Sequence, residues 1–428
     1  MVASLHRLVP ERTSSVLMAS GICLLIVGMP VSTAMQEIGA TTACAALAAR
    51  LLTDPSSTLI RRFPLIFLFA AFLGYLLVNS LLSINSRGSL SLLGSTLHRG
   101  FLLFLVGMEL ARRDSCTTAV VWALALTGFY EGLDGIWQYV VGRDLLAGLP
   151  WMGSRLTGSF STYRVGNLMA LTLAGSLALP LCMSRPRPFV FRLALALLLW
   201  GPALFLCIFA QARSGYICLA GALTAFFALR RGLSPLWLLP LAGVLVLGLL
   251  WGPERISLNT ALRDGRLKEL WPFAWTIFTE YPLFGSGIGT FSRAFNSLGL
   301  TPAMHSAGIE HPHNIYLQLL AETGLCGFSL FCSFAGLLLF RSRGVIRAAM
   351  AAPGGKAAIL LRAKAATFWS AAFGYLLMGV SAHSLFRTWW LSLGFLFLGL
   401  TAGSAMLLAS RAGHGGRHPE EDLSGNTD

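Results

Sequence analysis

Long apolar runs follow one another along most of this chain, and they constrain its fold more than any other feature. Each is close to the roughly 20 residues that a helix needs to cross a bilayer core of ~30 Å. Only helices and closed barrels satisfy their backbone polar groups in lipid, and runs this long are not the short alternating strands of a barrel. We therefore expect an all-α polytopic membrane protein. Its 12 predicted transmembrane helices lie near residues 14–32, 34–52, 63–83, 90–111, 116–140, 164–183, 189–211, 214–230, 235–251, 314–340, 364–383 and 389–410.

The composition excludes a water-soluble enzyme and argues against a nucleic-acid binder. Hydrophobic residues make up 55% of the chain and charged residues only 12%, whereas soluble domains carry about 25% charged residues. The formal charge of +14 comes from arginines that punctuate apolar runs and form no basic stripe. The eight cysteines include no C-x-x-C pair, so neither a zinc site nor a disulfide framework is indicated.

The positions of lysine and arginine predict the orientation. If the amino terminus is cytoplasmic, 20 of the 32 basic residues lie inside, as the positive-inside rule requires. Both termini are then cytoplasmic, and the one long connection lies on the outer side of the membrane. The predicted organisation is transmembrane helices 1–9 in residues 1–251, an outer loop in 252–313, helices 10–12 in 314–410 and a polar cytoplasmic tail in 411–428.

The long outer loop contains a predicted amphipathic helix, from Asp264 to Tyr281, whose apolar residues recur at helical spacing. An exposed helix with such a face lies at the membrane interface or caps a cavity. Pro272 should kink this helix or mark the point where it restarts. The following GSGIG sequence at 285–289 indicates a tight turn rather than a dinucleotide site, because no strand precedes it.

The charged residues inside predicted spans include Arg99, Glu109, Glu131 and Asp134. Glu131 and Asp134 lie three residues apart on one helical face near the outer end of the fifth span. They could pair with Arg99 or with an outer arginine, which would give them a structural role. Acids at this depth also suit a proton-coupled transporter, which keeps that class open.

Residues 310–314, EHPHN, stand where the outer loop meets the tenth span. Asn314 is a plausible N-cap for a helix that opens there, which places His313 at the water–lipid boundary. The histidine could instead be structural and bonded to the loop. A metal site built from His305, Glu310, His311 and His313 is a further alternative, although their spacing matches no established metal motif.

Outward-facing arginines are the second candidate feature. Arg213 lies in a very short connection between the seventh and eighth spans, and Arg266 opens the loop helix. The planar guanidinium binds phosphate in a bidentate manner and stays charged, so two such groups suit a lipid diphosphate without a metal ion. Arg213 could alternatively snorkel at a helix end. Further outward-facing basic residues are Arg155, Arg164, Lys268, Arg293 and Arg387.

The histidine segment resembles the O-antigen ligase family, within a wider group that includes O-antigen polymerases and bacterial protein O-oligosaccharyltransferases. The ligase pattern is a histidine, ten residues and then G-x-x-G, which His313, Gly324 and Gly327 match.

Three other segments resemble the same family. They are QARSG around Arg213, DGRLKELW around Arg266 with PLFGSGIG at 282–289, and RLTGSF from Arg155 with Asn167 beyond it. One element departs from the family, since a Ser-Thr-Tyr-Arg run ending at Arg164 stands where a proline–asparagine pair is common.

The resemblance implies inverting glycosyl transfer on the periplasmic face of the bacterial inner membrane. The donor is a glycan on undecaprenyl diphosphate, and the acceptor is a sugar hydroxyl of lipid A-core. A neutral imidazole, with a reference pKa of about 6.5, suits the removal of the hydroxyl proton, so His313 is assigned as the general base. Arg213 and Arg266 are assigned to the diphosphate charge that develops as the glycosidic bond breaks.

The remaining assignments concern substrate contacts. His311 and Asn314 orient the base or contact substrate, and the expected substrate-binding basic residues are Arg155, Lys268, Arg293 and Arg387. The donor already contains the bond energy, so no nucleotide, metal or other cofactor is expected, and the expected partners are the two lipid-linked substrates and membrane lipid.

Three alternative functions explain some of the same sequence features. O-antigen polymerisation uses the same donor but a second lipid-linked glycan as acceptor. Protein O-glycosylation is a lesser variant. A lipid or glycan transporter explains the spans and the acids within them, but not the long outer loop with its histidines.

Overall fold

The computed structural model describes residues 11–151, 154–160, 164–183, 188–231, 266–300, 309–381 and 384–414. Within these residues the chain forms helices and loops and no strand. The longer helices are α2 (Glu11–Gly28), α3 (Thr33–Thr53), α4 (Ile66–Leu81), α5 (Ser86–Thr96), α6 (Leu103–Leu110), α7 (Asp114–Val141), α8 (Val165–Gly175), α10 (Phe189–Phe209), α11 (Arg213–Arg231), α14 (Trp271–Glu280), α16 (Ile315–Ala351), α17 (Lys356–Met378) and α18 (Thr388–His414). The short elements are η1 (Pro55–Ser57), η2 (Ile60–Arg62), η3 (Leu97–Phe101), α9 (Leu179–Cys182), η6 (Arg266–Leu270), α15 (Phe291–Ser297) and η7 (Gly379–Ser381).

An all-helical membrane protein is confirmed for the described part of the chain. Six helical stretches there are long and apolar enough to cross a membrane: Glu11–Gly28, Ser86–Leu110, Asp114–Val141, Phe189–Phe209, Ile315–Ala351 and Thr388–Ala412. Every predicted run contains a helix except 235–251, which lies outside the described residues. The count of 12 spans therefore remains a prediction.

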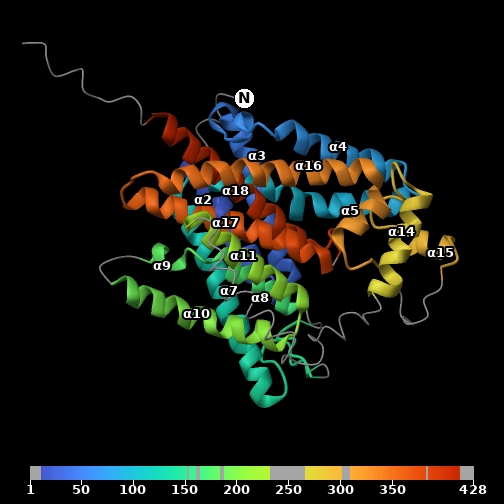
Figure 1. The fold of residues 1–428 in the computed structure, drawn as a ribbon, viewed down its shortest axis with the longest axis horizontal. Coiled ribbons are helices and arrows are strands. Elements are labelled where there is room, and N and C mark those ends of the chain that lie inside the picture. Colours follow the sequence, from blue (N-terminus) through green and yellow to red (C-terminus); the bar gives the residue numbers. More distant parts are fainter. Residues whose placement is uncertain are drawn as a thin grey trace, which may run out of the picture.

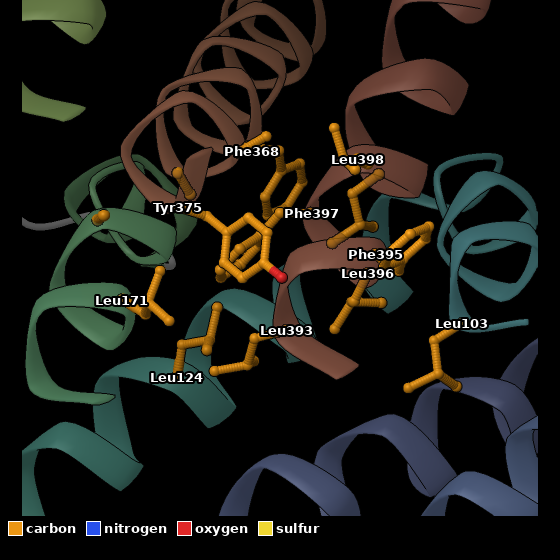
Figure 2. Packing of buried hydrophobic residues seen from close by; sticks show 14 of the residues in the cluster. Leu103, Leu124, Leu171, Phe368, Tyr375, Leu393, Phe395, Leu396, Phe397 and Leu398 are labelled. Carbon is orange, nitrogen blue, oxygen red and sulfur yellow. The ribbon is translucent and has the colours of Figure 1, made fainter. Parts of the chain in front are cut away.

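The centre of the bundle is α18, which packs against α6, α16 and α17 (Figure 1). Figure 2 shows the Tyr375 ring of α17 among apolar side chains of α18, with Leu171 of α8 on its other side. Small residues allow this close packing: a Cβ atom on Gly399 would come 2.0 Å from the Phe104 carbonyl oxygen of α6. Such backbone contact is typical of helix packing in membranes. Lipid tails are as apolar as the side chains, so helices associate through close packing and not through the hydrophobic effect.

The outer loop folds against one end of this bundle. Figure 1 shows α14 and α15 together at that end, beside α5 and the start of α16. Pro272 stands in the first turn of α14, so it marks the restart that the sequence predicts. The apolar face of α14 is covered by protein, since Ala274 and Ile277 are fully buried against α15 and α16. Residues 232–265, which include the ninth predicted span and the start of the loop, lie outside the described residues.

Among the described residues neither Glu131 nor Asp134 pairs with an arginine, so the predicted alternative of such a pairing is wrong. Glu131 accepts hydrogen bonds from the Ser159 backbone and hydroxyl, at 3.0 Å and 2.8–2.9 Å, and Asp134 accepts one from the Leu145 backbone at 2.6 Å. Arg99 instead forms an ion pair with Glu37 of α3. A backbone amide can satisfy a buried carboxylate as well as an arginine does.

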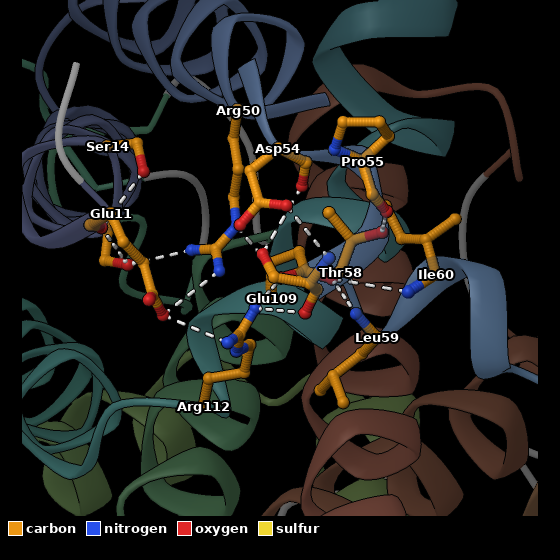
Figure 3. A network of polar contacts seen from close by, with 12 residues as sticks. Glu11, Ser14, Arg50, Asp54, Pro55, Thr58, Leu59, Ile60, Glu109 and Arg112 are labelled. Atoms are coloured by element: carbon orange, nitrogen blue, oxygen red, sulfur yellow. Dashed lines mark hydrogen bonds and ion pairs between the residues drawn. The ribbon is translucent and has the colours of Figure 1, made fainter. Parts of the chain in front are cut away.

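A buried cluster ties the ends of α2, α3 and α6 together (Figure 3). The carboxylate of Glu109 is fully buried, and it accepts hydrogen bonds from the Leu59 and Ile60 amides at 2.5 and 3.3 Å. Its other oxygen lies 3.4 Å from the Arg50 guanidinium, which is 2% exposed. This carboxylate therefore satisfies a turn and a buried cation at once.

We predict that Glu109→Ala sharply lowers the stability of the folded protein. The change leaves the buried Arg50 with less compensation, and breaking a buried pair in this way costs about 3–5 kcal/mol. Melting temperature in detergent is the measurement. Glu11→Ala is the matched control, because Glu11 pairs with the same arginine but is 47% exposed. Equal melting temperatures for the two variants would contradict this account of the cluster.

Candidate functional site

Helix α16 is broken at Gly324, one of the two glycines singled out by the sequence. This residue has φ 63° and ψ −171°, a conformation that is essentially restricted to glycine. It separates a first segment, which begins at Ile315, from the long apolar remainder of α16. The break changes the direction of the helix and leaves backbone groups without their usual partners in the helix.

The glycine-rich loop at 282–289 supplies those partners. The Leu325 and Cys326 amides donate to the carbonyls of Pro282 and Leu283, at 2.9 and 3.2 Å. In the opposite direction, the Gly287 amide donates to the Glu322 carbonyl at 2.8 Å. The tight turn predicted for GSGIG is confirmed, because all three of its glycines have positive φ. The two glycine motifs therefore form one interlocked structure.

Helix α4 supports this interlock with two polar side chains. The Tyr75 hydroxyl donates to the Thr323 carbonyl at 2.6 Å, and the Asn79 amide donates to the carbonyls of Phe284 and Glu322 at 2.6 and 3.1 Å. The Asn79 oxygen accepts from the Ile288 amide at 3.1 Å. Backbone groups freed by the break are thus satisfied by protein, as the membrane environment requires.

The candidate base stands at the head of the first α16 segment. Asn314 is the N-cap that the sequence predicts, and its side-chain oxygen accepts from the Tyr316 and Leu317 amides at 3.0 and 3.2 Å. His313 has φ 55°, so it turns sharply into the helix, and its ring centroid lies 4.3 Å from that of His311. His311 is buried, whereas His313 is partly exposed.

Gln318 fastens this segment to the loop that precedes α18. Its amide nitrogen lies 3.0 Å from the Glu322 carboxylate and 2.9 Å from the Ser384 hydroxyl. Its oxygen accepts from the Leu385 amide at 2.9 Å. Glu322 is fully buried, and it also accepts from the Phe291 amide of α15 at 3.1 Å. The histidine segment and the loop that carries Arg387 are therefore held in fixed relation.

Arg213 begins α11 directly after a three-residue turn, as the sequence predicts. Arg155 lies beneath this turn, 7% exposed, and donates to the carbonyls of Ala210 and Gln211 at 2.8 and 3.2 Å. The Ser214 hydroxyl donates to Asn167 of α8 at 2.8 Å. The geometry of Arg155 supports the turn that positions Arg213, and its substrate contact remains a prediction.

Arg164 lies close in sequence to Asn167, which contacts the arginine turn, and it interacts with Glu310 of the histidine segment. It immediately precedes α8, only three residues before Asn167. Its guanidinium is partly buried, and the carboxylate of Glu310, which begins the EHPHN sequence, interacts electrostatically with it.

A cavity of about 360 Å³ opens beside these elements. Its polar lining includes Gln36 and Glu37 of α3, and its aromatic lining is Phe160 and Trp389. Its remaining lining residues are Met29, Pro30, Val31, Ser32, Thr33, Arg99, Ser159, Arg164, Arg387 and Thr388. Of the basic residues predicted to contact substrate, Arg387 is the one found here.

The other predicted residues lie elsewhere or are incompletely described. Lys268, in η6, and Arg293, in α15, are both exposed on the outer-loop elements. The backbone of Arg266 begins η6, but the position of its side chain is outside the description. The metal alternative included His305, which also lies outside the described residues; those that are described include no cluster of three metal-ligating side chains.

Comparison with protein families identifies the segment that contains these elements. A family model described as O-antigen ligase matches residues 158–332. The matched segment belongs to the O-antigen ligase family. It runs from the loop at Gly158 to the part of α16 beyond Gly327, and thus includes Arg164, Arg213 and His313. No curated protein matches the chain.

Gln318 and Glu322, which support the histidine segment, were not predicted from the sequence. They follow Asn314 at intervals of four, which places all three on one face of the helix. That polar stripe within an apolar run was the available signal. Glu37, which faces the cavity, likewise stands as an acid within the second predicted span.

We predict that Gly324→Ala removes both activity and much of the stability of the ligase-family segment. A Cβ atom there would lie 2.3 Å from the Leu283 carbonyl oxygen, and the backbone conformation alone costs about 1–3 kcal/mol for other residues. Gly336→Ala in the same helix is the control, because its Cβ atom meets nothing within 4 Å. Monodisperse yield and melting temperature in detergent are the measurements, and a Gly324→Ala protein as stable as the control would contradict the interlock.

Proposed function

We propose that this protein is an O-antigen ligase, an inverting glycosyltransferase that moves a glycan from undecaprenyl diphosphate to a sugar hydroxyl of lipid A-core. One observation carries the proposal. The ligase spacing of a histidine followed after ten residues by G-x-x-G corresponds to one structural unit, in which a helix broken at Gly324 presents His313 at its head.

His313 acts as the general base in this proposal. The acceptor hydroxyl attacks the anomeric carbon of the donor glycan, its proton passes to the imidazole, and the bond from that carbon to the diphosphate oxygen breaks. Inversion follows from attack opposite the leaving group. General-base assistance is typically worth ~10²–10⁴-fold in rate. The partly exposed position of His313, beside the buried His311 ring, suits a group that contacts an incoming substrate.

Arg213 and Arg266 stabilise the departing diphosphate. A guanidinium held at a fixed position stabilises developing negative charge without reorganisation during the reaction. The support that Arg155 gives to the turn before Arg213 provides such a fixed position. His311 and Asn314 orient the base, and Lys268, Arg293 and Arg387 contact the glycans.

The site is assigned to the periplasmic face of the inner membrane, with both termini in the cytoplasm. The distribution of basic residues supports this orientation. No nucleotide or metal ion is required, since the donor is already activated by its diphosphate.

An O-antigen polymerase is the second candidate, because the family match does not distinguish ligation from polymerisation. The histidine-to-glycine spacing favours ligation. A transporter is disfavoured because Glu131, one of the two acids that suggested it, accepts hydrogen bonds from Ser159 with both of its oxygens.

We predict that His313→Ala lowers transfer by at least about 100-fold in purified enzyme, because the general base is lost. In the same assay, Arg213→Lys retains the charge but loses bidentate contact, and it should also impair transfer. The measurement is product formation from both purified lipid substrates, with excess chelator and without nucleotide. Arg347→Gln at the far end of α16 is the control. Normal transfer by the alanine variant would remove His313 from the mechanism.

A deletion strain separates ligation from its rivals. We predict bare core lipopolysaccharide together with polymer that accumulates on the carrier lipid, because assembly continues while transfer to core stops. Gel analysis of lipopolysaccharide and of carrier-linked glycan is the measurement. A single repeat attached to core would instead identify a polymerase, and repeats stranded in the cytoplasmic leaflet would identify a flippase.

A further inference from the structure

The cavity between α3, η3, the loop at 158–160 and the start of α18 has the chemical character of a site for an acidic sugar. Its volume of about 360 Å³ lies within the range of small-ligand pockets. Side-chain amide, carboxylate and hydroxyl groups can exchange hydrogen bonds with sugar hydroxyls, and Gln36, Glu37 and Ser159 supply them. Phe160 and Trp389 contribute apolar ring surface, with ring centroids 6.2 Å apart.

The charges around the cavity favour an anion. Three arginines line it, Arg99, Arg164 and Arg387, against the single carboxylate of Glu37. Two residues of η3 contact that carboxylate: Arg99 forms an ion pair with it, and the His98 ring nitrogen lies 2.7 Å from it. Glu310 offsets part of the charge of Arg164 from outside the cavity.

Arg387 is the group best placed to bind such an anion. Its terminal nitrogen Nη1 is buried and has no hydrogen-bond partner among the described residues. The loop that carries Arg387 is held by Gln318 through Ser384 and Leu385. Arg387 lines the cavity and is only partly buried, so its guanidinium can offer charge-assisted hydrogen bonds to an anionic ligand there.

We propose that this cavity is the acceptor subsite, and that it binds a sugar ring bearing a phosphate or carboxylate group. The inference rests on the proposed glycosyl transfer. The acceptor is the substrate that gives its proton to the base. The histidine segment is held beside the cavity, because Gln318 of that segment bonds Ser384 and Leu385, which lie just before the lining residue Arg387 in the chain. Neither Arg213 nor His313 is among the lining residues, so the bond-breaking groups lie outside the cavity.

Competition by soluble sugars tests this assignment. The probes are glucose 6-phosphate, glucuronic acid and glucose, each titrated into the purified transfer reaction at varied acceptor and varied donor concentrations. We expect the two acidic sugars to compete with the acceptor and to inhibit at least about tenfold more strongly than glucose. Arg387→Gln should remove this tenfold preference and raise the KM for acceptor more than the KM for donor.

The control is Arg347→Gln, an exposed arginine at the far end of α16, which should keep the preference for acidic sugars. Equal inhibition by all three sugars would overturn the subsite. Competition of the acidic sugars with the donor would also overturn it, by giving the cavity to the donor diphosphate. Absence of transfer with any acceptor would instead reject the proposed function, so the two failures are distinguishable.

Discussion

The site depends on how the protein satisfies the backbone of a membrane helix that is interrupted at Gly324. In lipid, every amide and carbonyl freed by such a break needs a partner. Here the 282–289 loop provides the partners, and Tyr75 and Asn79 of α4 hold the junction from the other side. The outer-loop helices are thereby fixed to α16. The helix segment that presents His313 obtains its direction from the same junction.

The charged groups buried in the bundle are likewise satisfied by neighbouring protein groups. Glu109 satisfies the η2 turn together with Arg50, and Glu131 holds the loop that contributes Ser159 and Phe160 to the cavity. Both acids bind neighbouring groups of the protein itself. A bundle that needs its acids for packing has few left for proton coupling, which favours an enzyme over a transporter.

The sequence predicts the helices, the cap at Asn314 and the turn at 285–289, because apolar runs, capping residues and glycines act locally. It could not predict the partners of Glu131 and Asp134, since a backbone amide can come from any residue type. Nor could it predict that Arg155 supports a turn while Arg387 faces a cavity. Outward-facing arginines look alike in sequence, and only packing between distant segments separates their roles.

The proposed transfer between two membrane-bound substrates would use residues from well-separated helices. The arginine proposed to bind the diphosphate belongs to the turn before α11, the proposed base to the head of α16, and the proposed acceptor cavity is lined by α3, η3 and α18. Gln318 connects the base segment with the loop of Arg387, so the base and the cavity keep a constant separation. In this proposal the donor and the acceptor bind separate groups of residues, so neither substrate has to displace the other at His313.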